Sequence, residues 1–435
     1  MFKMIRHQMW NQRRQNSWIF LELLIAGFFL WMVVDPICVI TADRAIPSGY
    51  DSQGMYVLKL GNYDSSFAEY DETQDADSLL DLHYRQILRT IRTCPEIESF
   101  TIGAFGSFPN SPSWSGNQYY NDSVKLHAQT YYFVQIDGSD MGKTYGFTDA
   151  NTGKQLQLPA DFSQREMVAL SACAAKRLFG TTDVVGRKVL GHNREKELEI
   201  AAVFQDIKHF DVEQPYPLSI RSMKFEVSPY MTFSQDIVFR LKKGVDEGDF
   251  RERFEHEVVP HLFQGNFYYD GLRTFDEYAY EKAVSSGVIN RLRLHYSLAG
   301  FAILCIFLGM VGTFWIRSNA RREEIGLMRS MGASQGCIVR QFLMEAWILV
   351  TIAFLLSLWG VANYVYIEGF AEPAKLLLFG DYHPDPAYWQ NRVLPHFMVV
   401  TLITYVLLLL TALVGTYIPV RRAARILPAD ALRDE

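Results

Sequence analysis

Long apolar runs alternate with polar segments along this chain. Apolar residues dominate residues 18–40, 295–316, 342–367 and 396–420. Each run has the length of about 20 residues that an α-helix needs to cross the hydrocarbon layer of a membrane. The pattern therefore predicts four transmembrane helices.

The first apolar run has two interpretations, a secretory signal peptide or an uncleaved span. It is longer than the roughly 7–15 apolar residues of a signal peptide, and Trp18 and Trp31 fit anchoring at a membrane interface. We expect an uncleaved span. Glu22 is then expected near the cytoplasmic interface, and Asp35 with Pro36 at the outer end; a proton relay is the alternative role for these acids.

Residues 41–294 have the composition of a soluble domain inserted between the first two spans. Short runs typical of strands lie at residues 55–60 and 98–105, with a helical pattern between them. An α+β domain is the most economical account of this mixture. The predicted fold class is thus an α-helical membrane protein with four transmembrane helices and a large α+β extracytoplasmic domain.

A helix is expected within this domain at residues 78–92. Leu79, Leu82, Ile87 and Ile91 lie at spacings that form an apolar stripe on such a helix. We expect this stripe to face the core of the domain.

Positive charge indicates how the chain crosses the membrane. Lys and Arg number four in residues 1–17, five in 317–340 and four in 421–435, against two in 368–395. Because cytoplasmic loops carry an excess of Lys and Arg, both termini and the central loop are expected in the cytoplasm. The large domain is then expected on the side of the membrane opposite to the cytoplasm. The net charge of -6 argues against a nucleic-acid partner.

The charged segment at residues 321–334 lies between the second and third apolar runs. Ile325 with Met328, and Leu327 with Met331, follow helical spacing. The pattern predicts a short amphipathic helix. A solvated loop that only provides charge is the alternative.

Two residues are placed to bound this helix. Gly332 suits the left-handed position that ends a helix, and Ser334 suits the first position of the next one. A separate short helix before the third span is therefore expected.

The segment Arg-Arg-Glu-Glu-Ile-Gly-Leu-Met-Arg-Ser-Met-Gly-Ala-Ser resembles a motif of the FtsX-like and MacB-like ABC transporter permeases, R-x-x-E-I-G-x-x-[RK]-[AS]-x-G-A. In that family the matching helix is the coupling helix that contacts the ATPase subunit. The resemblance assigns ten residues to this contact: Arg321, Arg322, Glu323, Glu324, Ile325, Gly326, Met328, Arg329, Gly332 and Ala333.

Two further segments resemble the same family. Residues 168–189 are similar to a signature of the MacB-like periplasmic core domain, with Val184 where the family has Pro, and residues 419–433 are similar to its C-terminal motif. The resemblance implies two subdomains, one from residues 50–105 and 234–280 and one from the segment between them. Separately, the helical pattern that begins at residue 277 predicts a stalk helix that runs into the second span without a break.

The predicted organisation combines the apolar pattern with this resemblance. Its parts are a cytoplasmic segment 1–17, span 18–40, a MacB-like periplasmic core domain 41–294, span 295–316, a cytoplasmic loop with the coupling helix 317–341, span 342–367, an outer loop 368–395, span 396–420 and a cytoplasmic tail 421–435, with 277–435 as the FtsX-like region.

By this resemblance the chain is the permease subunit of an ABC transporter. The family implies a separate ATPase subunit that binds ATP and Mg²⁺, a second permease copy or paralogue, and a periplasmic adaptor or outer-membrane channel as a further partner. It implies mechanotransmission for efflux or for lipoprotein or peptide export. The alternatives are a non-transporting FtsX-like regulator of a periplasmic cell-wall hydrolase, and a membrane-anchored enzyme. The transported substrate, and homodimer against heterodimer, stay open.

Apparent catalytic motifs do not favour the enzyme alternative. Residues 138–144 imitate a phosphate-binding loop, but Asp137 stands where the first glycine is required. His256 and His261 are five residues apart, and Pro260 interrupts the helix that should align them on a zinc ion. We expect no catalytic, cofactor-binding or metal-ligating residue in this chain.

Two cysteines, Cys94 and Cys173, are expected outside the membrane, where a disulfide between them is possible. Both lie in apolar helical surroundings that suit buried thiols. The sequence leaves the two states open.

Overall fold

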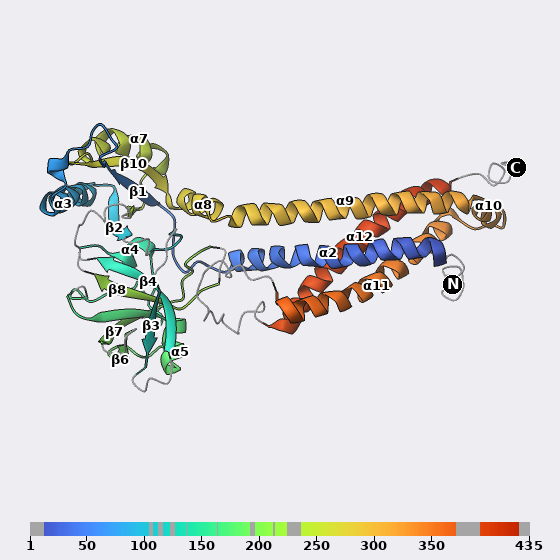
Figure 1. Cartoon of the computed structure of the whole chain (residues 1–435), viewed down its shortest axis with the longest axis horizontal. Coiled ribbons are helices and arrows are strands. Elements are labelled where there is room, and N and C mark those ends of the chain that lie inside the picture. Colours follow the sequence, from blue (N-terminus) through green and yellow to red (C-terminus); the bar gives the residue numbers. More distant parts are fainter. Residues whose placement is uncertain are drawn as a thin grey trace. The chain divides into compact units, whose positions relative to one another are not determined.

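The computed structural model describes residues 13–103, 108–111, 116–121, 127–136, 138–162, 164–191, 196–211, 214–223, 236–370 and 392–425. Most of the predicted outer loop 368–395, most of the cytoplasmic segment 1–17 and the end of the tail lie outside these residues. The chain divides into two compact units, a helical unit and a unit rich in strands, which we call the outer unit after its predicted location (Figure 1).

Four long helices and one short helix build the helical unit. They are α2 (Arg13–Ala45), α9 (Val288–Ala320), α10 (Arg322–Ser330), α11 (Gln335–Glu368) and α12 (Val393–Ala423). The four long helices are long and apolar enough to cross a membrane, which confirms the predicted fold class for this unit. Each is longer than the apolar run that predicted it, because its polar ends continue the helix.

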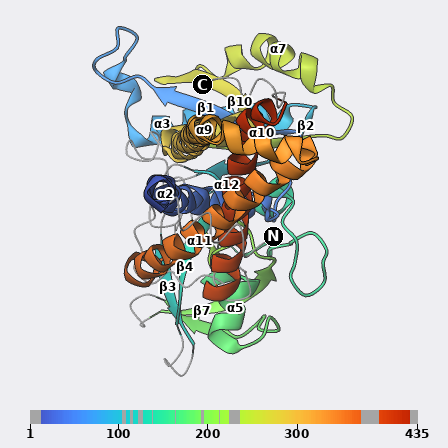
Figure 2. The same cartoon turned by 90° about the vertical axis from the view of Figure 1, so that its right-hand side faces the viewer.

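The core of the helical unit forms where the long helices pack together. Trp31 of α2 is fully buried, and its indole N–H donates to Thr401 Oγ1 at 3.2 Å. Helices α11 and α12 cross one another (Figure 2), with the ring of Tyr405 5.4 Å from that of Phe354. Apolar side chains and a few satisfied polar groups thus hold the four helices together.

The first long helix extends beyond Asp35 and Pro36, where the outer end of the first span was expected. Helix α2 continues through Pro36 to Ala45. Proline is tolerated inside membrane helices because neighbouring helices compensate for its missing N–H group. Asp35 is buried and lies 2.6 Å from Nε2 of His396 on α12, so this acid is paired inside the bundle.

The outer unit contains a four-stranded sheet and a closed barrel. The sheet has the order β10-β1-β9-β2, and all its neighbouring strands are antiparallel. Its strands are β1 (Met55–Asn62), β2 (Ile97–Gly103), β9 (Asp236–Leu241) and β10 (Phe267–Thr274). They come from the two segments that were predicted to form one subdomain.

The segment between β2 and β9 builds the barrel, in the order β3-β4-β8-β5-β7-β6. Its strands are β3 (Gly116–Tyr120), β4 (His127–Ile136), β5 (Met167–Ser171), β6 (Lys188–Leu190), β7 (Glu197–Phe204) and β8 (Leu218–Met223). Pairs β4 with β8 and β5 with β7 are parallel, and the other pairs are antiparallel. A mixed α+β domain with two parts is therefore confirmed.

Short helices cover the sheet and connect the strands. They are η1 (Glu72–Gln74), α3 (Asp77–Thr93), α4 (Met141–Tyr145), α5 (Ala172–Phe179), α7 (Glu247–Glu257), η3 (Val259–His261) and α8 (Phe275–Ser285). The helix expected at 78–92 is α3, but Leu80 and Tyr84 are buried on it together with Ile87 and Ile91, whereas Leu82 is exposed. The predicted stripe was partly wrong because Tyr84 packs into the core beside Phe267.

The segment that resembled the periplasmic signature folds as strand β5 followed by helix α5. Ser171 begins the helix, and its Oγ accepts from the N–H groups of Ala174 at 3.4 Å and Leu218 at 2.9 Å. Gly180 ends the helix with a φ of 75°, a conformation that glycine adopts without strain. These residues have structural roles.

The unbroken stalk expected from residue 277 into the second span is wrong. Helix α8 ends at Ser285 and α9 begins at Val288. Gly287 lies between them with a φ of 79°, in the left-handed region that ends a right-handed helix. The helix is therefore interrupted at Gly287, where a continuous helix was expected.

Cys94 and Cys173 are free thiols in the structure, so no disulfide joins them there. Cys94 is buried in the core beneath the sheet, and Cys173 lies at the start of α5. Burial raises the pKa of the Cys173 thiol well above its ordinary value, which favours the unreactive protonated form.

His209 makes the stability of the outer unit depend on pH. Burial lowers the pKa of His209 to about 4 from an ordinary value of 6.5. The imidazole is thus neutral in the folded protein while the unfolded chain takes up a proton below pH 6.5. The stabilisation is complete above pH 6.5, decreases as the pH falls, and has decreased by about 3 kcal/mol at pH 4.

We predict that His209→Gln weakens this pH dependence. The unfolding temperature of the outer unit in the full-length protein, followed from pH 7 to pH 4.5, should fall less for the variant than for the wild type. The exposed His261 provides the control, because His261→Gln should keep the wild-type slope. Equal slopes for wild type and His209→Gln would contradict the assignment.

Candidate functional site

The turn between α9 and α11 has the helical form that the sequence predicted. Helix α10 follows directly after Arg321, and the chain then turns through Gly332, which has a φ of 94°. Ser334 begins α11, and its Oγ accepts from the N–H group of Cys337 at 3.2 Å. Local backbone geometry therefore separates the short helix from α11.

A buried network of charges ties this turn to the long helices. Glu345 of α11 is 1% exposed and accepts from Arg317 Nη2 at 3.2 Å and from Arg321 Nη1 at 3.2 Å. Arg321 also donates to both carboxylate oxygens of Glu324 on α10, at 2.7 and 3.0 Å. The side chains of Arg317 and Arg321 are only 3% and 6% exposed. We call these four residues the charge network.

Aromatic rings complete the surroundings of the two guanidinium groups. Arg321 lies over the ring of Phe342 at 4.7 Å, and Arg317 lies over that of Phe314 at 5.1 Å. Removing one partner of a buried ion pair costs about 3–5 kcal/mol, because the other charge stays buried without compensation. The charge network thus fixes α10 between α9 and α11.

The other face of α10 exposes large apolar side chains. Leu327 is 54% exposed and Met331 is 72% exposed, whereas Ile325 and Gly326 are buried. The apolar residues of the predicted amphipathic helix therefore fall into two groups: Ile325 faces the inside of the turn, and Leu327 and Met331 face the outside. Exposed apolar side chains of this size, beside charged neighbours, are typical of a surface that contacts a partner. We call Leu327 and Met331 the apolar tip.

The ten residues assigned to the coupling contact have different surroundings. Arg321, Ile325 and Gly326 are buried, Glu323 and Gly332 are exposed, and Arg322, Glu324, Met328, Arg329 and Ala333 are partly buried. The first group anchors the turn, and the second is available to a partner.

The sequence analysis missed the two residues at the centre of the charge network, Glu345 and Arg317. Glu345 lies inside the predicted span 342–367, where an acid is expensive unless it is paired. That signal was present in the sequence. The partners of Glu345 could not be predicted from the sequence, because Arg317 and Arg321 lie 28 and 24 positions away along the chain.

The segments that imitated catalytic motifs lie at α4, α7 and η3. Asp140 begins α4 by accepting from the N–H group of Lys143 at 2.9 Å. His256 and His261 lie on separate elements, α7 and η3. Over the described ranges, the structure contains no group of three metal-ligating side chains.

Comparisons with known proteins place similarity at this turn and beyond it. Residues 296–428 match the model of the FtsX-like permease C-terminal domain. The matched residues include α10 and the whole charge network. The macrolide export ATP-binding/permease protein MacB of Wolinella succinogenes is 23% identical over 321 residues, covering 72% of this chain and 44% of that protein. The chain therefore spans less than half the length of this relative.

Two further proteins are similar. The uncharacterized ABC transporter permease YknZ of Bacillus subtilis is 22% identical over 321 residues, covering 70% of this chain and 72% of that protein. The crystal structure of the periplasmic region of MacB from Actinobacillus actinomycetemcomitans aligns with 55% of this chain and 94% of its own, at 14% identity and a TM-score of 0.28. Because this TM-score is low, we assign the fold from the topology described above and not from this alignment.

We predict that Glu345→Gln destabilises the helical unit. The substitution removes the carboxylate that pairs with both Arg317 and Arg321 and leaves Glu324 to Arg321 alone, at a cost of about 3 kcal/mol. The unfolding temperature of the purified chain in one detergent should fall clearly below that of the wild type. Glu323→Gln, at an exposed position of the same turn, is the matched control and should leave it unchanged.

A double variant separates the ion pair from other effects. Replacing Glu345 and Arg317 together by Leu removes both charges. The decrease in the free energy of unfolding should therefore be smaller than the sum of the decreases for Glu345→Leu and Arg317→Leu alone. If Glu345→Gln is as stable as Glu323→Gln, the charge network does not hold the turn.

Proposed function

We propose that this chain, an ABC transporter permease of the MacB/FtsX type, couples ATP hydrolysis by a partner ATPase to movements of its outer unit. The observation that carries the proposal is a turn held rigidly by the charge network while its apolar tip stays exposed. A partner that contacts the tip displaces α10. Because α10 is tied to α9 and α11, the displacement passes to both helices.

ATP and Mg²⁺ belong to the ATPase partner in this proposal. Two permease copies, or a permease and a paralogue, bind two ATPase subunits, so that closure of the ATPase pair moves two turns at once. The outer unit then acts on the cargo, with a periplasmic adaptor or an outer-membrane channel as a further partner. We propose mechanotransmission in place of a polar path through the helices.

The proposed location is a bacterial inner membrane, with both termini and α10 in the cytoplasm and the outer unit in the periplasm. Support comes from the four apolar helices and from the distribution of Lys and Arg, five of which lie in residues 317–340. This orientation places the apolar tip on the side of the membrane where ATP is available.

Efflux, or export of a lipoprotein or peptide, is the proposed purpose. The name of the MacB relatives includes macrolide export, and that activity belongs to those proteins. A regulator of a cell-wall hydrolase uses the same turn, and differs in that the outer unit binds an enzyme and no cargo moves. Two results together would favour the regulator: a hydrolase binds to the outer unit, and cells that lack the chain export cargo as the wild type does.

We predict that Leu327→Asp with Met331→Asp weakens ATPase binding about tenfold or more, because two apolar contacts are lost and charges are introduced. The measurement is the rate of ATP hydrolysis in liposomes that contain the permease, as the ATPase concentration is raised.

The variant should fold as the wild type does, since both side chains are exposed. Leu82→Asp, at an exposed position of the outer unit, is the control and should leave the ATPase response unchanged. Equal ATPase binding by the tip variant and the wild type would refute a partner contact at α10.

A further inference from the structure

Two arginines at the end of α12 lie over aromatic rings. The guanidinium group of Arg422 is 5.1 Å from the centre of the Trp315 ring on α9. That of Arg421 is 5.5 Å from the centre of the Tyr417 ring on α12. Both arginines are exposed and belong to the last turn of α12. We call Trp315, Tyr417, Arg421 and Arg422 the arginine–aromatic surface.

Close packing of α9 and α12 fixes the two sides of this surface relative to one another. A Cβ atom added at Gly415 of α12 would lie 2.9 Å from Cβ of Met310 on α9, so the two helices approach closely there. Trp315 and Arg422 each lie between one and two turns, roughly, beyond this contact along their helices. The ring and the guanidinium group are therefore brought together by the helix packing.

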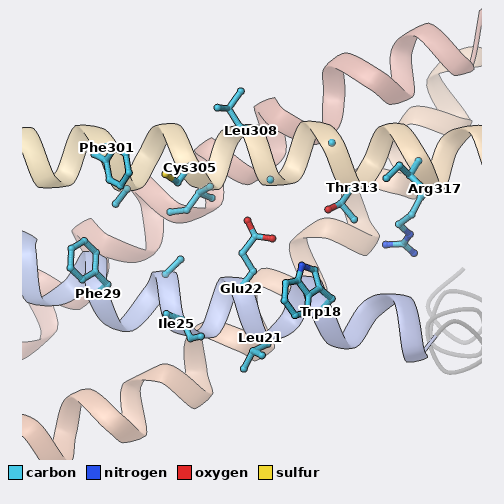
Figure 3. A pocket seen from close by; sticks show the side chains of 16 residues that line it. Trp18, Leu21, Glu22, Ile25, Phe29, Phe301, Cys305, Leu308, Thr313 and Arg317 are labelled. Carbon is cyan, nitrogen blue, oxygen red and sulfur yellow. The ribbon is translucent and has the colours of Figure 1, made fainter.

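The arginine–aromatic surface is separate from the apolar groove between α2 and α9, which contains Glu22. Figure 3 shows that Thr313 and Arg317 of α9 line this groove. Trp315 is two residues from each of them, a rotation of about 200° around the helix axis. Trp315 thus lies on the opposite side of α9, toward α12.

The arginines at this end of the helical unit fall into two groups. Arg317 and Arg321 are buried and pair with Glu345. Among the residues that the structure describes, none forms an ion pair or a hydrogen bond with the side chain of Arg421 or Arg422. An aromatic ring attracts a cation but does not neutralise its charge. Two positive charges in fixed positions are therefore available to an anion from outside the chain.

An exposed apolar stripe leads away from these charges along α12. Leu410, Val414 and Ile418 are 55%, 52% and 49% exposed, and Arg422 is the next residue at the same spacing of four. Residues four positions apart are neighbours on the surface of a helix. A soluble anion would contact the arginines and leave the stripe uncovered, whereas a lipid has an anionic head for the arginines and an acyl chain for the stripe.

We propose that the arginine–aromatic surface binds a phospholipid with an anionic headgroup. The phosphate lies on Arg421 and Arg422, and an acyl chain lies along Val414 and Ile418. The N–H donors of a guanidinium group match the geometry of a phosphate. Trp and Tyr rings are common at the level of lipid headgroups, which agrees with the place of Trp315 beside Arg422. The binding needs no ATPase and no movement of the outer unit, so it can fail or succeed independently of the proposed coupling.

The test measures binding of dioleoylphosphatidylglycerol and dioleoylphosphatidylcholine to the purified full-length chain by native mass spectrometry in one detergent. Both lipids have the same acyl chains, so a difference in affinity reports the charge of the headgroup. The wild type should bind phosphatidylglycerol about fivefold or more tightly than phosphatidylcholine. Equal affinity for the two lipids would overturn the proposal.

Substitutions of single arginines locate the site. Arg422→Gln should weaken phosphatidylglycerol binding about fivefold or more, and Arg422→Lys should keep most of the affinity because it retains the charge. Arg340→Gln is the matched control, since Arg340 is exposed near the start of α11 and its loss changes the total charge equally. If Arg422→Gln and Arg340→Gln bind phosphatidylglycerol equally well, the lipid does not bind at this surface.

A second pair of variants changes a ring and keeps every charge. Trp315→Leu removes the ring that positions Arg422, so phosphatidylglycerol binding should weaken about twofold to fivefold. Trp359→Leu removes an exposed indole from α11 and should bind as the wild type does. Wild-type affinity for phosphatidylglycerol in Trp315→Leu would contradict a role for the ring.

Glycerophosphoglycerol, the headgroup without acyl chains, distinguishes a lipid from a soluble phosphodiester. If a lipid is the occupant, an excess of glycerophosphoglycerol should leave phosphatidylglycerol bound, because the soluble molecule makes no contact with the apolar stripe. Displacement of the lipid by this molecule would identify a soluble anion as the ligand and overturn the assignment to a lipid.

Discussion

The buried carboxylate of Glu345 is the constraint on which the turn between α9 and α11 depends. It lies between two arginines from the end of α9, and one of these also holds α10 through Glu324. Taking these charges out of water is expensive, so the arrangement is stable only while every member keeps its partners. A short helix that would be marginal alone is thereby held to two long helices.

The acids of α2 show two different solutions to the same physical problem. Asp35 lies in the bundle against His396, and the pair satisfies its charge and hydrogen-bonding needs within the chain. Glu22 lies in an apolar groove with no such partner among the described residues. The two acids of α2 therefore differ in what the described part of the chain provides for them: a buried histidine for Asp35, and apolar walls for Glu22.

The outer unit shows how backbone geometry limits a prediction made from pattern alone. The apolar spacing of α3 indicated a stripe through Leu79 and Leu82, yet the helix buries Leu80 and Tyr84, since Tyr84 carries a large apolar ring despite its hydroxyl. The helical pattern after residue 277 continued into the second span, but Gly287 adopts a left-handed φ and separates α8 from α9. Periodicity reports which side chains are apolar and does not report where the backbone turns.

The sequence by itself determined the four membrane helices, the mixed outer domain and the short helix between Arg321 and Gly332. These features follow from local signals: runs of about 20 apolar residues, alternation and capping residues. Only the tertiary structure decided which charges meet, such as Glu345 with Arg317, and which apolar residues of α10 stay exposed. Such pairings join positions far apart in the chain, and their free energy arises from burial that exists only after the helices have packed.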